Sequence, residues 1–210
     1  MKRTAFFLVC LLTALCGQAQ NITAQLTEFH DFRPAIVYTA DGKRVKVPLA
    51  NIFLKNSSLL FVNDKGTAME VNTKTLLRVD FDSCSYYRID SLLATPVDTV
   101  GNYVLYKAKV IDIKAYQQIL KNNKNITNLD LTSMQDMISY STVELSEQEA
   151  FPLIPIFYIR MGDKFVLAHE RHLKLNLDKE HRRRMEGLLS QPGFSWTDEK
   201  SLVQLMSLIQ

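Results

Sequence analysis

The chain has 210 residues, of which 47% are hydrophobic, and it contains 25 lysines and arginines and 22 aspartates and glutamates. This composition is typical of an ordered globular protein and excludes a disordered chain. The formal net charge of +3 falls to about +1 when the two basic residues of the leader described below are removed. A charge this close to zero gives no electrostatic basis for binding nucleic acid, so we expect no nucleic-acid partner.

The first residues predict export. Positions 2 and 3 are basic, residues 6–15 form an apolar run, and residues 17–19 (Gly-Gln-Ala) supply the small residues of a signal-peptidase site. We therefore expect a signal peptide at 1–19, cleaved after Ala19, and a location in the periplasm, outside the cell or elsewhere in the cell envelope. The apolar run is about half of the ~20 residues that a spanning helix needs, and no later segment reaches that length. The mature chain is expected to have no transmembrane segment.

Cysteine usage is compatible with this location. Cys10 and Cys16 leave with the signal peptide, so only Cys84 remains and the mature chain cannot form an internal disulfide. A lipoprotein signal with Cys16 as the lipidated residue is the alternative, but Leu15 stands where that signal needs a small residue. No Cys-His motif surrounds Cys84, and we interpret it as a small buried hydrophobic residue rather than a nucleophile.

Residues 20–95 form the first predicted unit, a β-meander or small barrel. Short runs rich in Val, Leu, Ile and Tyr alternate with turn residues, and Asp41-Gly42 between two such runs is a strong hairpin signal. The expected strands are 35–39, 44–49, 50–54, 59–62, 67–71, 76–82 and 85–90. Strands this short and this regularly spaced predict an antiparallel sheet that is closed or nearly closed.

Residues 96–175 form a second β-rich segment with one short helix. Alternation over 97–113 predicts a strand region with Tyr103, Leu105 and Val110 as inward residues. The helix is expected at 114–124, and strands are expected at 153–160 and 164–168, joined by a turn at Gly162-Asp163. The helix presents Tyr116, Ile119 and Leu120 on one face. A further helical turn within 131–139 and a strand at 141–145 are also predicted.

Residues 176–210 are expected to form a C-terminal helical hairpin. A helix over 177–189 ends before Pro192-Gly193, and residues 195–198 (Ser-Trp-Thr-Asp) cap a last helix. Each helix has an apolar face that must pack against the other helix and the sheet. These faces consist of Met185, Leu188, Leu189, Leu202, Leu205, Met206 and Ile209. The fold class is therefore α+β, mainly antiparallel β.

Several of these segments together resemble a group of exported Bacteroidota proteins of no known activity. The shared features are a signal ending "GQAQ", an opening of the "G…V…AN…L…F…G…V…R-V-D-F" kind followed by a tyrosine pair, a late "IFYIRMGDKFVLA" hairpin, and closing helices around "FSWTDEKSLVQLMSLI". The resemblance implies an exported envelope protein without catalysis, and it carries no functional residues to this chain.

The stretch His169-Glu170-Arg171-His172 is one residue short of the His-Glu-x-x-His zinc motif, in which the two histidines share a helical face. Leu173, Leu175 and Leu177 alternate with polar residues after it, which predicts a strand that continues through the stretch. In a strand, the two imidazoles point to opposite faces and cannot share a metal. We interpret the stretch as a polar strand end and expect no metal site. Whether His181 converges with His169 and His172 is left open.

A basic run, Arg171, Lys174, Lys179 and Arg182 to Arg184, could contact anionic lipid, lipopolysaccharide or an acidic partner. Glu170, Asp178, Glu180 and Glu186 are interleaved with it, so a helix surface with salt bridges such as Glu180–Arg184 is favoured.

Two further sets of residues are candidates. Asp80 and Asp82 lie on one side of a predicted strand, about 7 Å apart, a spacing open to acid–base chemistry or calcium. Val79 and Phe81 fill the opposite face of this strand, which is typical of an ordinary half-exposed strand. Tyr86 and Tyr87 beside Arg88, with Trp196 elsewhere, could bind sugar or peptide, but neighbouring strand residues face opposite ways, so one tyrosine belongs to the core.

These patterns lead to three functional hypotheses. The favoured one is a non-enzymatic envelope protein that serves as a binding or interaction module for a protein or surface polymer. The first alternative is a metal-assisted hydrolase that uses His169 and His172, and the second is a small-ligand or glycan binder. No catalytic or cofactor motif is recognised in the sequence, so no cofactor is predicted. The oligomeric state is left open.

Overall fold

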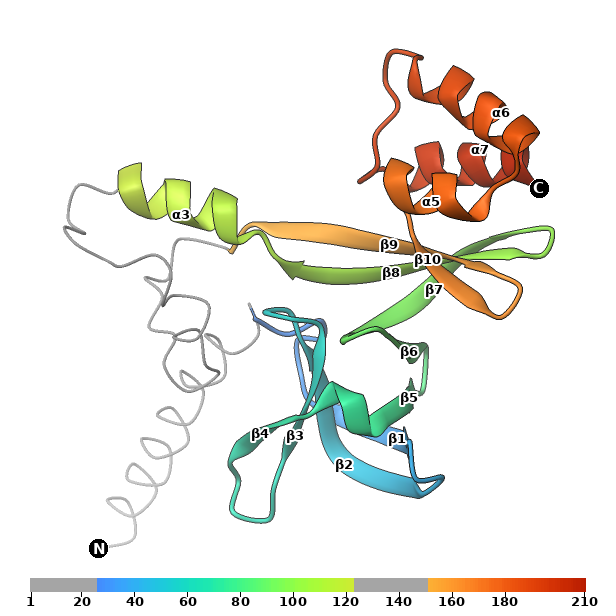
Figure 1. Ribbon diagram of the computed structural model, residues 1–210. Helices are drawn as coiled ribbons and strands as arrows, with labels where there is room; N and C mark the ends of the chain where they lie inside the picture. Colours follow the sequence, from blue (N-terminus) through green and yellow to red (C-terminus); the bar gives the residue numbers. More distant parts are fainter. Residues whose placement is uncertain (1–25, 123–150) are drawn as a thin grey trace, which may run out of the picture.

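The computed structural model describes residues 26–122 and 151–210 (Figure 1). The described residues form one ten-stranded antiparallel sheet with the strand order β10-β9-β8-β7-β6-β5-β1-β2-β3-β4, together with a few helices. The prediction of a mainly antiparallel β protein is thus confirmed. The signal peptide expected at 1–19, with its cysteines, and the elements expected at 131–139 and 141–145 lie outside the described residues.

The strands are β1 Arg33–Thr39, β2 Arg44–Phe53, β3 Ser58–Val62, β4 Ala68–Val71, β5 Leu76–Phe81, β6 Ser85–Ile89, β7 Leu92–Val100, β8 Tyr103–Ile111, β9 Leu153–Met161 and β10 Lys164–Leu167. The helices are the 3₁₀ helix η2 Thr73–Thr75 and the α-helices α3 Ile113–Asn122, α5 Glu170–Asn176, α6 Lys179–Leu189 and α7 Glu199–Ile209.

The turns expected between the strands are present. Gly42 in the β1–β2 turn and Gly162 in the β9–β10 turn have positive φ angles, which glycine adopts at no steric cost. The segments 44–49 and 50–54, expected as two strands, are instead the continuous strand β2. Pro48 is tolerated there because β3 pairs only with residues 50–53, so the first half of β2 lies at an edge of the sheet.

The sheet curls into a half-barrel until the β2–β3 turn meets the middle of the sheet. The backbone N–H of Leu93 donates to the Ser57 carbonyl over 2.8 Å, and the Ser57 hydroxyl donates back to the Leu93 carbonyl over 2.6 Å. The N–H of Ile111 donates to the carbonyl of Leu54 over 2.9 Å. These bonds join β7 and β8 to the β2–β3 turn across the half-barrel.

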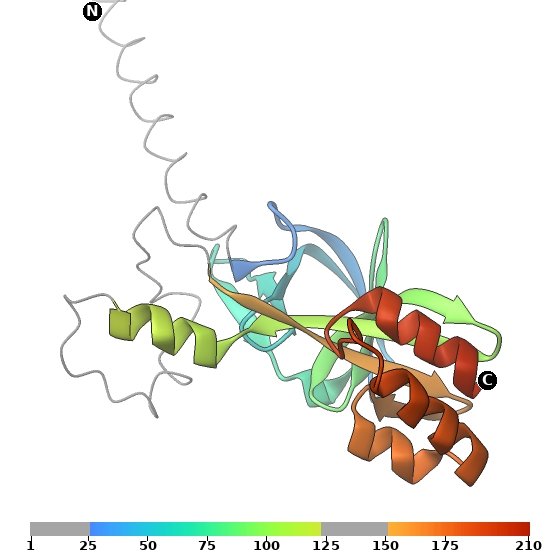
Figure 2. The ribbon, with the colours of Figure 1, turned by 90° about the horizontal axis from the view of Figure 1, so that it is seen from above.

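The two faces of the sheet differ in what covers them. On the inner face, Ala35, Val37, Val79 and Leu93 are buried inside the half-barrel. The same face continues through Leu105 of β8, which packs against the C-terminal helices. The outer face is the opposite side, on which the side chains alternate with these residues along each strand. No described helix covers the outer face over β5, β1 and β2 (Figures 1 and 2).

The C-terminal helices pack over one end of β8 and β9, and α3 extends from the other end (Figure 2). The predicted apolar faces of α6 and α7 meet one another and the sheet, with Met185, Leu188, Leu202 and Leu205 buried. Beyond them, the hydroxyl of Tyr103 donates to the carbonyl of Ile209 over 3.1 Å.

Three helices occupy this end rather than the two expected. Residues 170–176 form α5, where the sequence pattern predicted a continuing strand. The alternation of Leu173, Leu175 and Leu177 has a different cause: Leu173 and Leu177 lie four residues apart and are both buried, whereas Leu175 is 75% exposed. Of the predicted unit boundaries, the one at 95/96 falls within β7 and the one at 175/176 falls within α5.

Among the described residues, no helix has both the length and the apolar content that crossing a bilayer requires.

Replacing Asn51 by alanine tests how the segment before β1 is held. The fully buried Asn51 amide accepts from the N–H of Phe29 over 3.1 Å and donates to the Phe29 carbonyl over 2.9 Å. Asn51→Ala leaves the Phe29 N–H without a partner, whereas the Phe29 carbonyl keeps the Thr27 hydroxyl at 2.9 Å. We therefore expect a loss of about 1–3 kcal/mol in the free energy of unfolding, measured by urea denaturation. Asn102→Ala in the exposed β7–β8 turn is the control, with an expected change below about 0.5 kcal/mol. Equal stability of the two variants would contradict the role assigned to Asn51.

Candidate binding groove

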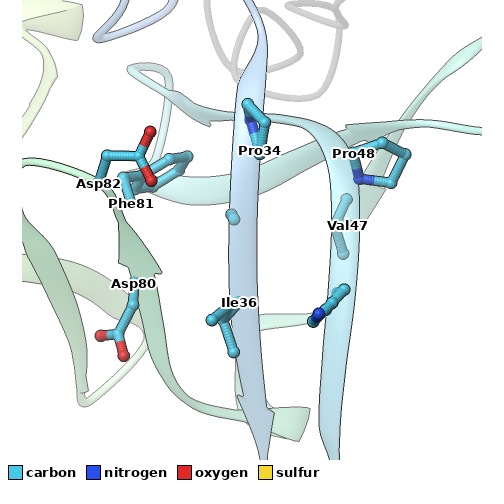
Figure 3. A pocket seen from close by; sticks show the side chains of 9 residues that line it. Pro34, Ile36, Val47, Pro48, Asp80, Phe81 and Asp82 are labelled. Carbon is cyan, nitrogen blue, oxygen red and sulfur yellow. The ribbon is translucent and has the colours of Figure 1, made fainter.

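A groove of about 480 Å³ lies where β5, β1 and β2 run side by side (Figure 3). Its lining residues are Pro34, Ala35, Ile36, Lys46, Val47, Pro48, Asp80, Phe81 and Asp82. Strands that are distant in sequence supply the two walls, because β1 pairs with β2 on one side and with β5 on the other. The groove is in the size range of ligand and peptide sites in proteins.

The floor of the groove is apolar and its geometry follows from a β-bulge. The register between β1 and β2 shifts between Arg33 and Ala35, opposite Pro48, so the two strands do not stay evenly paired there. Pro34 and Pro48 are exposed beside the half-buried Ile36. Proline cannot donate to the sheet ladder, which is why both prolines lie at this irregular edge.

Opposite charges stand on the two walls. Ile36 of β1 is paired with Lys46 on one side and with Asp80 on the other, which places these two residues about 10 Å apart across the strands. Asp82 follows one residue after the end of β5. Lys46 and Asp82 are both exposed, and within the described residues neither charged group has an ion-pair or hydrogen-bond partner.

Asp80 differs from Asp82 because it is already neutralised. Its Oδ2 lies 2.9 Å from Nη2 of Arg78, and the Asp80 side chain is only 23% exposed. The Arg78 guanidinium carbon lies 4.2 Å from the ring centroid of Tyr38 and 5.9 Å from that of Tyr87. Of this ion pair and its two tyrosines, only Asp80 lines the groove. The predicted carboxylate pair therefore has two unequal members. Val79 and Phe81, which alternate with them on the opposite face of the strand, are buried.

The tyrosine pair is divided between the two faces. Tyr86 is buried in the inner core, where loss of hydration raises the pKa of its hydroxyl far above the ordinary value. Tyr87 is half-buried on the outer face, with its ring centroid 5.7 Å from that of Tyr106. The expectation that one of the two belongs to the core is confirmed.

Cys84 is half-buried and packs against the inner core rather than inside it. The prediction of a buried hydrophobic residue is therefore met only in part. Its neighbours there include Phe81 and Tyr86.

The histidine stretch is helical, which corrects the predicted strand end. His169 precedes α5 and caps it, because its Nδ1 accepts from the N–H of Arg171 over 3.4 Å. The helix brings the ring centroids of His169 and His172 to within 6.2 Å, and the His169 ring stacks on Trp196 at 5.9 Å. The strand was predicted because leucines two residues apart have the same spacing as β alternation. The cap at His169 and the contact of its ring with Trp196, in the loop before α7, favour the helix.

His181 does not join the other two histidines. Its Nδ1 lies 2.7 Å from Oδ2 of Asp178, the residue that caps α6. In the described part of the chain, no group of three or more His, Cys, Asp or Glu side chains is arranged to hold a metal ion. A zinc site needs three protein ligands for catalysis and four for a structural role, and this stretch brings two imidazoles together.

The basic run carries the predicted salt bridges. Lys174 lies 2.7 Å from Glu170 and 2.8 Å from Glu186, linking α5 to α6. Arg184 pairs with Glu180, four residues earlier. The salt bridges therefore offset the charges of Lys174 and Arg184 only. The other basic residues of the run have no ion pair within the described residues: Arg171, Lys179, Arg182 and Arg183.

Comparison with known protein families, with curated proteins and with solved structures found no match for this chain. Any assignment of function therefore depends on the residues of the groove and of the surfaces around it.

Asp178 provides a pH test of how the helical end is held. The N–H of His181, and next its imidazole, lower the pKa of Asp178 below the ordinary value. Its stabilising contribution is present above the pKa of the unfolded state and is lost as the pH falls through the lower folded-state pKa. We expect wild type to be more stable than Asp178→Asn at pH 7, and the difference to shrink as the pH falls below about 4. Urea denaturation at several pH values measures this, with Asp64→Asn as the control. A difference that grows in acid would contradict it.

Proposed function

We propose that this chain is an exported, non-enzymatic protein of the cell envelope that acts as an interaction module, and that it contacts a protein partner through the groove. The observation that carries the proposal is an apolar floor between two walls whose charges, Lys46 and Asp82, have no partner within the described residues. Apolar surface surrounded by polar groups is typical of protein contact sites. Export is supported by the signal-peptide pattern of the first 19 residues.

A further exposed apolar side chain supports the same proposal. Leu49, which follows Pro48 in the bulge of β2, is 43% exposed. Together with Pro34 and Pro48 it adds to the apolar surface at this end of the groove. Burying such surface is the main favourable term in protein association.

A protein partner is favoured over a sugar polymer by the state of the nearby aromatic rings. Glycans stack on exposed ring faces, but the face of Tyr38 is occupied by the Arg78 guanidinium. Tyr87 is half-buried and contacts Tyr106 edge to face. A surface polymer is accordingly the alternative outcome of the test rather than the expected one.

Ile36→Thr tests the groove while keeping a β-branched residue in β1. Loss of apolar contact at the groove floor is expected to weaken partner binding about tenfold. The immobilised mature chain is used to capture partners from envelope extract, and the recovered protein is then titrated against both forms. Val62→Thr on β3, a half-buried strand position outside the groove, is the matched control. Recovery of polysaccharide alone, or equal binding by both variants, would contradict the proposal.

Measuring the zinc content of the purified protein distinguishes the interaction module from the alternative, a metal-assisted hydrolase. Since α5 brings two imidazoles together, we expect protein purified without an affinity tag to contain zinc well below one ion per chain. Added zinc should then raise the melting temperature of wild type no more than that of His172→Ala. Stoichiometric zinc that is lost in His172→Ala would favour the hydrolase instead.

A further inference from the structure

The charges on the groove are arranged so that the groove complements a copy of itself. Lys46 stands on the β2 wall, Asp82 stands at the end of the β5 wall, and apolar residues of β1 lie between them. We propose that the outer face around the groove is the contact surface of a symmetric homodimer, in which it packs against the same face of a second copy of this chain. This inference rests on the proposed function, because it takes the same contact surface and names the protein that covers it.

Two-fold symmetry satisfies both unpaired charges at once. In an isologous interface, residue i of one copy contacts residue j of the other, and residue j contacts residue i. A two-fold axis that lies in the interface and passes over β1 places Lys46 of each copy opposite Asp82 of the other. Ile36, near that axis, then packs against its own counterpart. A single arrangement thus forms two ion pairs and buries both apolar floors.

The contact is made face to face rather than edge to edge. The first half of β2 has an open edge, since β3 pairs only from Ala50 onward. That edge carries Arg44, Lys46 and Pro48, and cationic and proline residues on an edge oppose the addition of another strand. The outer face has no such obstacle, and it is the side on which Ile36 and Lys46 lie together in one cross-strand row.

The contact surface proposed for the homodimer is small. The groove spans three strands, or about 15 Å across the sheet, which corresponds to the low end of protein interfaces. We therefore expect reversible association with a dissociation constant in the micromolar range. Asp80 adds little to it, because its carboxylate is already paired with Arg78.

Charge exchange at Lys46 and Asp82 tests the inference on the mature chain. Lys46→Glu sets two carboxylates against one another across the axis, and Asp82→Lys sets two ammonium groups against one another. Each variant alone is expected to weaken association at least about tenfold in sedimentation equilibrium. The double variant Lys46→Glu/Asp82→Lys restores opposite charges and is expected to dimerise as wild type does.

Mixing the two single variants gives a second, independent readout. In the mixed dimer, the introduced glutamate meets the introduced lysine, and the native Asp82 meets the native Lys46. The mixture is therefore expected to form heterodimers that neither variant forms alone. The matched controls are Lys65→Glu and Asp64→Lys, which make the same charge changes at exposed positions in the β3–β4 turn and should leave the association of wild type unchanged.

Circular dichroism and urea denaturation confirm that each variant is folded. A wild type that stays monomeric up to a concentration of about 200 μM would overturn the homodimer, as would single variants that dimerise normally or a double variant that does not recover. One outcome would contradict the homodimer without contradicting the proposed function. A monomeric wild type whose capture of an envelope protein is lost in Ile36→Thr keeps the groove as a contact surface and assigns it to a different partner.

Discussion

The structure depends on the point where the β2–β3 turn closes onto the middle of the sheet. Ser57 and Leu93 exchange two hydrogen bonds there, although 36 residues separate them. The bonds hold the half-barrel in its curl, and burial of Ser57 makes them costly to break, because each freed backbone group would be left without water. The same curl turns the inner faces of β5, β1 and β2 toward the core and their outer faces away from it.

The groove is a consequence of that curl. The inner face of β1 packs in the core, where Ala35 and Val37 are buried. The alternating residues Pro34, Ile36 and Tyr38 therefore lie on the outer face. A helix could have covered these residues, but α3, α5, α6 and α7 all lie at the two ends of β8 and β9 (Figure 1). The bulge at Pro34 and Pro48 then opens the space between β1 and β2.

Most of the strands and the helices α6 and α7 could be predicted from sequence because each is encoded locally, by alternation, by turn residues such as Asp41-Gly42 and by the apolar faces of α6 and α7. The stretch 97–113, expected as one strand region, is instead divided between β7 and β8 by a turn at residues 101–102. The groove could not be predicted, because it depends on β5 lying beside β1, a pairing between residues about 40 positions apart. Helix α5 was missed for a different reason. Its buried residues Leu173 and Leu177 are four apart, and the exposed Leu175 between them produces a misleading period of two.

Asp80 and Asp82 show why the sequence pattern was informative yet incomplete. Both were recognised as carboxylates on one side of a strand, but only the three-dimensional pairing distinguishes them. Asp80 lies inside β5 and pairs with Arg78, whose guanidinium lies over the rings of Tyr38 and Tyr87, so the Asp80 carboxylate has a cation within the fold. Asp82 lies one residue past the strand, where no cation of the described chain reaches it. A carboxylate that is left unpaired on the rim of an apolar surface gains an ion pair only when another molecule supplies the cation. Its position therefore favours association over stability.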